Sequence, residues 1–143
     1  MKLKISGFTG ICILLVFIFT ACGTEKTERD KILNRTNPIA ERMLKAIDQN
    51  NYVEFSSDFD DSLKKDFTEK KFYDLHSFMK KSQGEYVSKS FFSIIRDKNS
   101  LTVQYFAVYK IKTPTYLLGL TFNNADGSGS LSRFSLIPFN VSR

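Results

Sequence analysis

The sequence lacks a long hydrophobic run. Its apolar stretch near the N-terminus, Ile11 to Phe19, is nine residues long, whereas a helix that crosses a bilayer needs roughly 20 apolar residues. Small and polar residues interrupt the stretch when it is extended back to Ile5. The length argues against a spanning helix, and it fits the ~7–15 residues that form the apolar core of a secretion signal.

The order of residues around this stretch is that of a complete signal. Lys2 and Lys4 precede it, and Phe19-Thr20-Ala21-Cys22 follows with small residues beside the cysteine. This segment resembles the lipobox of bacterial lipoproteins, although that family usually has leucine where Phe19 stands. The resemblance implies that residues 1–21 are removed, that a diacylglyceryl group joins Cys22, and that the protein is lipid-anchored at the cell membrane, outside the cytoplasm. Ordinary signal cleavage and an uncleaved anchor are the alternatives.

Cysteine and histidine are scarce, with two cysteines and one histidine in 143 residues. Cys12 leaves with the signal and Cys22 carries the lipid, so we expect no disulfide and no cysteine metal site. An exported domain without disulfides depends on packing. Eleven of the fourteen phenylalanines and all six tyrosines lie after Cys22 and supply apolar surface for it.

Charge of one sign does not dominate the chain. The net charge of +6 is modest, and acidic and basic residues are mixed along the sequence. No nucleic-acid motif appears, and exported proteins do not ordinarily meet chromosomal DNA, so we predict no nucleic-acid partner. No Ser-His-Asp set, glycine-rich phosphate loop or internal repeat is present, and we predict no cofactor.

The part of the chain after the signal is long enough for one domain. Residues 22–37 are mostly polar and predict a tether, followed by a single domain over residues 38–143. Asn37-Pro38 is a typical helix start. Ile39, Met43 and Ile47 then recur at a spacing of four and predict one buried helical stripe.

The next segments predict further helices and then strands. Residues 52–67 favour short helical pieces. The next helix is expected to begin at its cap, Thr68, and to run to about Lys81, with Gly84 as the stop signal after it. The apolar period then changes to two, which predicts strands over about 85–96, 101–111, 116–122 and 130–139. The expected fold is α+β, with N-terminal helices packed on a curved four-stranded antiparallel meander.

This order of elements resembles the nuclear transport factor 2-like superfamily, also called cystatin-like. The helix near Pro38, the break at Asp48-Gln49-Asn50-Asn51-Tyr52 and the turn at Phe59-Asp60-Asp61-Ser62-Leu63 carry the resemblance, together with the third helix and four strands. It implies a sheet that wraps a helix into a cone, often dimeric through the sheet. Members include enzymes and binding modules, so the fold does not decide function.

Three groups of residues are weak candidates for chemistry. His76 is the single histidine and favours a packing role over proton transfer. The oxygen-rich loop Asn123–Gly129 favours a turn over a metal or phosphate site. An acidic cluster favours helix capping over calcium binding. It consists of Asp58, Asp60, Asp61, Asp66 and Glu69.

The outward-facing positions of the strands are a stronger candidate. Odd positions of the strand from Leu101 suit the core, so Phe106 and Val108 would point away from the helices, beside Leu117 of the next strand. Apolar residues on an otherwise wet face indicate an interface for a partner or a second copy. Folding of the tail after Phe139 over these residues is the alternative.

Taken together, these features predict a lipid-anchored protein of the cell envelope that acts as a binding or interaction module without enzymatic activity. Two other functions stay open. One is a small enzyme that uses the interior of the cone, and the other is a surface lipoprotein for exclusion or immunity of a mobile element. A polar cavity holding His76 beside an acid would favour the enzyme.

Overall fold

The computed structural model describes residues 10–111 and 113–139, with side chains from Glu25 onward. The chain divides into two units, Met1–Asn34 and Arg35–Arg143, and each is described by itself. Helix α1, Gly10–Asp48, contributes its last part to the second unit. None of the helices in the described residues combines the length and the apolar character needed to cross a bilayer.

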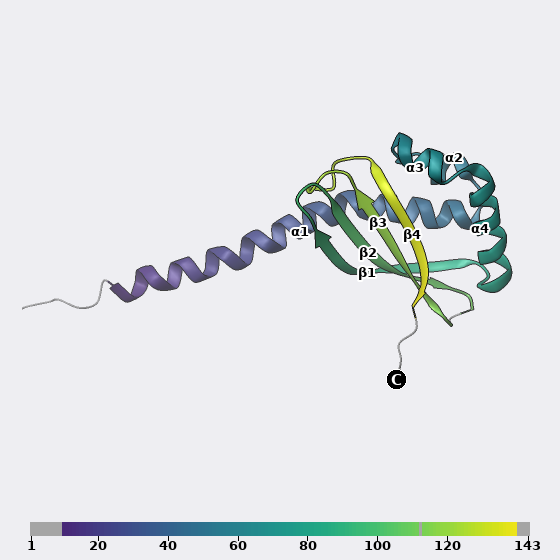
Figure 1. Ribbon diagram of the computed structural model, residues 1–143. Coiled ribbons are helices and arrows are strands. Elements are labelled where there is room, and N and C mark those ends of the chain that lie inside the picture. The colour runs from purple at the N-terminus through teal and green to yellow at the C-terminus, as the bar shows by residue number, and fades with distance from the viewer. Residues whose placement is uncertain (1–9, 112, 140–143) are drawn as a thin grey trace, which may run out of the picture. The chain divides into compact units, whose positions relative to one another are not determined.

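The second unit has an α+β architecture, as predicted (Figure 1). Helices come first, and a four-stranded antiparallel sheet with the strand order β1-β2-β3-β4 follows. After α1 the elements are α2 (Tyr52–Phe55), α3 (Asp61–Asp66), α4 (Glu69–Ser82), β1 (Tyr86–Arg96), β2 (Leu101–Tyr109), β3 (Thr115–Phe122) and β4 (Leu131–Phe139).

The start of the first helix differs from the prediction. Pro38 lies inside α1 rather than at its beginning, and the polar residues predicted as a tether are helical. Proline removes one helical hydrogen bond, which normally marks a helix boundary. Opposite charges at i and i+4, Glu25 with Arg29 and Lys26 with Asp30, favour helix in the polar segment. The side chains of residues 25–31 are exposed.

The other helix ends follow local chemistry. The Asn51 side chain accepts a hydrogen bond from the backbone amide of Glu54, and Asp60 caps α3 by accepting one from Leu63. Thr68 occupies the cap position of α4 without a side-chain bond to the helix. Gly84 follows α4 with a positive φ of 75°, a conformation that costs glycine little. The predicted end of this helix is confirmed.

Alternation along the strands gives the sheet two distinct faces. In β2 the odd positions from Leu101 to Tyr109 are buried and the even positions are half-buried, as predicted. Phe106 pairs with Leu117, and Tyr105 pairs with Leu118. A pair of opposite residues in a sheet shares one face, so the pairings assign each strand residue to one side.

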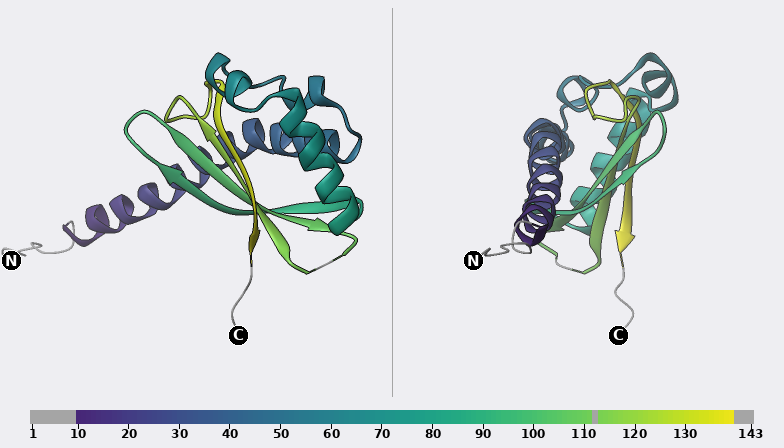
Figure 2. Two further views of the ribbon diagram at one scale, coloured as in Figure 1. Left: turned by 45° about the vertical axis from the view of Figure 1, so that its right-hand side comes forward. Right: turned by 90° about the vertical axis from the view of Figure 1, so that its left-hand side faces the viewer.

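The face toward the helices forms the core. Met43, Leu44 and Ile47 of α1 are buried, and the Tyr105 hydroxyl lies 2.8 Å from the hydroxyl of Thr36. Phe55 sits at the centre of an aromatic group, with ring centroids about 5 Å from its neighbours. Those neighbours are Phe59, Phe67, Phe72 and Phe134. Figure 2 shows α4 on the same side of the sheet as this part of α1.

Candidate functional site

The other side of the sheet, which we call the outer face, is the best candidate site. Its positions follow from the strand pairings. They are Ser88, Ser90, Ser93 and Ile95 of β1, Thr102, Gln104, Phe106 and Val108 of β2, Thr115, Leu117, Gly119 and Thr121 of β3, and Arg133, Ser135, Ile137 and Phe139 of β4.

Charge is nearly absent from the outer face. Arg133 is the single charged residue among these positions, although a quarter of the whole chain is charged. The central parts of protein interfaces are depleted of charged residues in the same way. The outer face is therefore much poorer in charge than the chain as a whole.

Three phenylalanine rings form an aromatic cluster on the outer face. The Phe106 centroid lies 4.6 Å from that of Phe92 and 5.2 Å from that of Phe139. Phe92 lies at a register shift in β1, between Phe91 and Ser93, so it is an extra residue between two regular pairs. The bulge brings its ring to Phe106, and 45% of Phe92 stays exposed.

The structure brings the three predicted surface residues to neighbouring positions. Phe106 and Val108 are half-buried on β2, whereas Leu117 is only 9% exposed because it lies between two strands. Ile137, its partner on β4, is 51% exposed. The residues after Phe139, which could have covered this surface, lie outside the described residues.

Sequence reasoning missed Phe92, Ile137 and Phe139. Ile137 and Phe139 are two residues apart on the last strand, so a period of two could have placed both side chains on one face of the sheet. Phe92 has no comparable signal because the bulge changes the phase of β1.

The other half of the outer face, around Thr102 and Gln104, consists of polar residues that hydrogen-bond to one another. The Ser93 hydroxyl donates to Gln104 over 2.6 Å, and the hydroxyls of Thr102 and Thr121 lie 2.9 Å apart. Gly119 lies between the halves, where an added Cβ would come within 2.6 Å of the Ser135 hydroxyl oxygen. The Ser135 hydroxyl therefore occupies the space that a side chain at position 119 would need.

His76 has a structural contact. Its Nδ1 lies 2.6 Å from the carbonyl oxygen of Ile47, so Nδ1 carries a proton and donates to the last turn of α1. The bond links α4 to α1 across half-buried surface. The predicted packing role fits this geometry, in which the partner is a backbone carbonyl rather than an acid.

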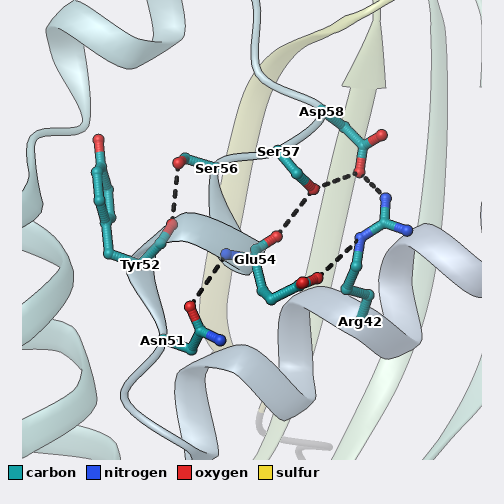
Figure 3. Close-up of polar contacts among 7 residues, drawn as sticks. All are labelled: Arg42, Asn51, Tyr52, Glu54, Ser56, Ser57 and Asp58. Carbon is teal, nitrogen blue, oxygen red and sulfur yellow. Dashed lines mark hydrogen bonds and ion pairs between the residues drawn. The ribbon is translucent and has the colours of Figure 1, made fainter.

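Members of the acidic cluster have separate structural roles. Asp60 caps α3, and Asp58 binds the guanidinium of Arg42 on α1 (Figure 3). The Ser57 hydroxyl oxygen lies 2.9 Å from the Glu54 carbonyl oxygen and 3.3 Å from an Asp58 carboxylate oxygen, and its one hydrogen can be donated to either of them, which ties the turn after α2 together. Within the part of the chain that the structure describes, no three acidic, histidine or cysteine side chains come together as metal ligands.

A shallow hollow of about 590 Å³ lies beside Arg42. Glu41, Lys45 and Glu54 also line it, so its charges are mixed. Arg42 Nε is buried without a hydrogen bond, 3.9 Å from Glu54 Oε2, while the other end of the guanidinium is held by Asp58. The arrangement fixes Arg42 between α1 and the turn, and it does not select one sign of ligand.

The loop Asn123–Gly129 is built as a turn. Asp126 accepts hydrogen bonds from the amide and hydroxyl of Ser128, and Arg35 donates to the Asp126 carbonyl. These Ser128 bonds hold the pKa of the Asp126 carboxyl below its ordinary value. Gly127 has a φ of 72°. The Asp126 carboxylate is thus bonded to Ser128 and its carbonyl to Arg35.

Cys22, the predicted lipidation site, falls within α1, and its side chain lies outside the described side chains. Comparison of the sequence with protein-family models and with curated proteins finds no match. The candidate site therefore stands on the geometry and composition of the outer face.

Proposed function

We propose that this chain is a lipid-anchored protein of the cell envelope that acts as a non-enzymatic binding module through the outer face of its sheet. The single observation that carries the binding role is the nearly uncharged outer face with its cluster of Phe92, Phe106 and Phe139. The lipobox-like segment at Phe19–Cys22 supports the anchoring.

The same proposal includes a fold of the nuclear transport factor 2-like kind, with a protein partner or a second copy bound at the sheet. The order of three short helices and four antiparallel strands after α1 supports this. Sheets pack face to face about 10 Å apart, and a surface with a single charged residue, Arg133, suits such an approach.

Site-specific photo-crosslinking in the producing cells tests the binding role. A benzophenone analogue of phenylalanine replaces Phe106, and the matched control places it at Tyr73, which is 42% exposed on α4. We expect a discrete crosslinked band from position 106 and none from position 73. A band at twice the mass of the chain identifies a second copy, and another mass identifies a partner.

Labelling the same cells with a tagged fatty acid tests the anchor. We expect the label on the wild-type chain and its loss in Cys22→Ala. A mature protein that begins at another residue, or equal crosslinking from positions 106 and 73, would contradict the corresponding half of the proposal.

A further inference from the structure

A hollow of about 470 Å³ lies at the polar end of the outer face. One row of paired positions across the four strands lines it, namely Ile95, Thr102, Thr121 and Arg133. Asp97, in the turn that joins β1 to β2, lines it as well. Figure 1 shows this turn and the β3–β4 loop at the same end of the sheet. The hollow therefore lies away from the aromatic cluster.

Arg133 is a cation in this hollow without a partner of its own. Within residues 10–111 and 113–139, neither a hydrogen bond nor an ion pair holds its guanidinium. Asp97 lines the same hollow but does not reach Arg133 as an ion pair. One Asp97 oxygen accepts a hydrogen bond from the Lys98 amide over 2.7 Å, which leaves the other oxygen for a ligand. A cation and an anion thus stand at separate places in one hollow.

The hydroxyl groups between these charges add one donor. The Thr102 and Thr121 hydroxyl oxygens lie 2.9 Å apart, and each hydroxyl has one hydrogen and two lone pairs. Their mutual bond uses one hydrogen, so the other remains for a ligand. The Ser132 hydroxyl donates to the Thr121 carbonyl over 3.1 Å and offers its lone pairs. Ile95, which is 53% exposed, supplies apolar surface.

The two charges select the chemistry of the ligand. A guanidinium matches the planar geometry of a carboxylate, whereas a dianion such as phosphate would also be repelled by Asp97. A ligand with a carboxylate and an ammonium suits both residues. β2 and β4 are two strand spacings apart, roughly 10 Å. Two extended residues span at most about 7 Å, so with the reach of the Arg133 and Asp97 side chains a dipeptide matches this separation.

We propose that the hollow binds a dipeptide with free ends, its carboxylate on Arg133 and its ammonium on Asp97. The central peptide group lies over the hydroxyls of Thr102 and Thr121, and a ligand side chain contacts Ile95. A second copy is less suitable because the outer-face positions include no acidic residue that could meet Arg133. The site shares the outer face with the proposed interface but does not depend on a partner at the aromatic cluster.

A chemical-shift titration tests the site, with alanyl-alanine as the probe and the isotope-labelled full chain in mild detergent. We expect saturable shifts of the Thr102 and Thr121 amides, with half-saturation at about 5 mM or below for a ligand of this size. Amidation of the probe's carboxylate, or acetylation of its amine, should each weaken binding about tenfold or more, because each removes a charged hydrogen-bonding group.

Charge-matched variants of the protein provide the control. Arg133→Gln and Lys98→Gln each remove one positive charge from an exposed side chain, but only Arg133 lines the hollow. We expect Arg133→Gln to weaken binding about tenfold or more and Lys98→Gln to change it less than about twofold. Asp97→Asn should weaken binding of alanyl-alanine and leave binding of its N-acetyl form unchanged, a difference that a merely structural role would not produce.

Several results would overturn the dipeptide site. They are no saturable shift at 50 mM alanyl-alanine, equal affinities of Arg133→Gln and Lys98→Gln, undiminished binding of the amidated or acetylated probe, and tighter binding of inorganic phosphate. Self-association that Arg133→Gln abolishes would assign the hollow to a second copy and also contradict the proposal. The modified probes decide the matter on the wild type if a variant does not fold. Crosslinking from position 106 is measured separately, so failure of either proposal leaves the other standing.

Discussion

Neighbouring residues of the same strands lie on the inner and outer faces of the sheet, in different environments. Tyr105 is fully buried and bonded to Thr36, while Phe106, next in sequence, lies on the opposite face against Phe92 and Phe139. Both faces are rich in aromatic residues, but helices cover one of them in the second unit. Apolar composition therefore does not by itself separate core from candidate interface, and covering by another element does.

Tyr105→Glu should give the largest difference between the faces. It replaces a fully buried ring by a carboxylate and removes the bond to Thr36. Lys89 Nζ lies 4.7 Å from the ring centroid but is already bonded to Asn37, and we expect a loss of about 3–5 kcal/mol in the free energy of unfolding. Urea unfolding followed by near-UV circular dichroism measures this loss. A cooperative transition near that of the wild type would show that the inner face tolerates charge and is not a packed core.

Alkaline pH should have the next largest effect, a loss of folding stability that arises on the inner face. Burial is the main cause that raises the pKa of Tyr86 and Tyr109 well above the ordinary range. A raised folded pKa contributes stability that is complete below the ordinary value of about 10 and is lost as pH rises above it. We expect each tyrosine to cost up to about 1.4 kcal/mol per pH unit there.

Unfolding free energies at pH 8 and pH 11 for the wild type and Tyr109→Phe test this dependence. Tyr109→Phe should flatten the decline because it removes one titrating hydroxyl. Identical slopes for the two proteins would contradict the assignment to Tyr109.

Two tyrosine-to-phenylalanine substitutions compare a hydrogen-bonded hydroxyl with an unbonded one on the inner face. Tyr105→Phe removes the bond to Thr36 and should cost about 0.5–1.5 kcal/mol. Tyr109→Phe should be neutral or slightly stabilising, because its buried hydroxyl has no hydrogen-bond partner among the described residues. Denaturant midpoints of the two variants at pH 7 give the answer, and an equal loss in both would contradict it.

Of the two substitutions that introduce a carboxylate, Phe106→Glu should have the smaller effect on stability. The half-buried side chain lies on the outer face, which no described helix covers, so we expect a change within about 1 kcal/mol together with reduced crosslinking to the partner or second copy. Introducing the crosslinker at Phe92 in the Phe106→Glu background measures the association. Unfolding of this variant would mean that the outer face is a second core, covered by a part of the chain outside the described residues.

Much of the fold could be predicted from local patterns. A change of apolar period from four to two marked the passage from helices to strands, and Gly84 marked its position. The start of α1 could not be predicted in this way. Pro38 indicated a boundary, whereas two charge pairs within residues 25–30 favoured helix before it, and the helix continues through the proline.

Which strand residues share a face follows from the order of residues, because side chains alternate with a period of two wherever the ladder is regular. Which apolar residues stay exposed and which aromatic rings meet follows from the packing of distant segments. Phe92 joins Phe106 through a bulge, Leu117 is covered by its neighbours, and Asp58 reaches the edge of β4 from a distant turn. These contacts join residues far apart in the chain, and their geometry is set by packing rather than by local preference.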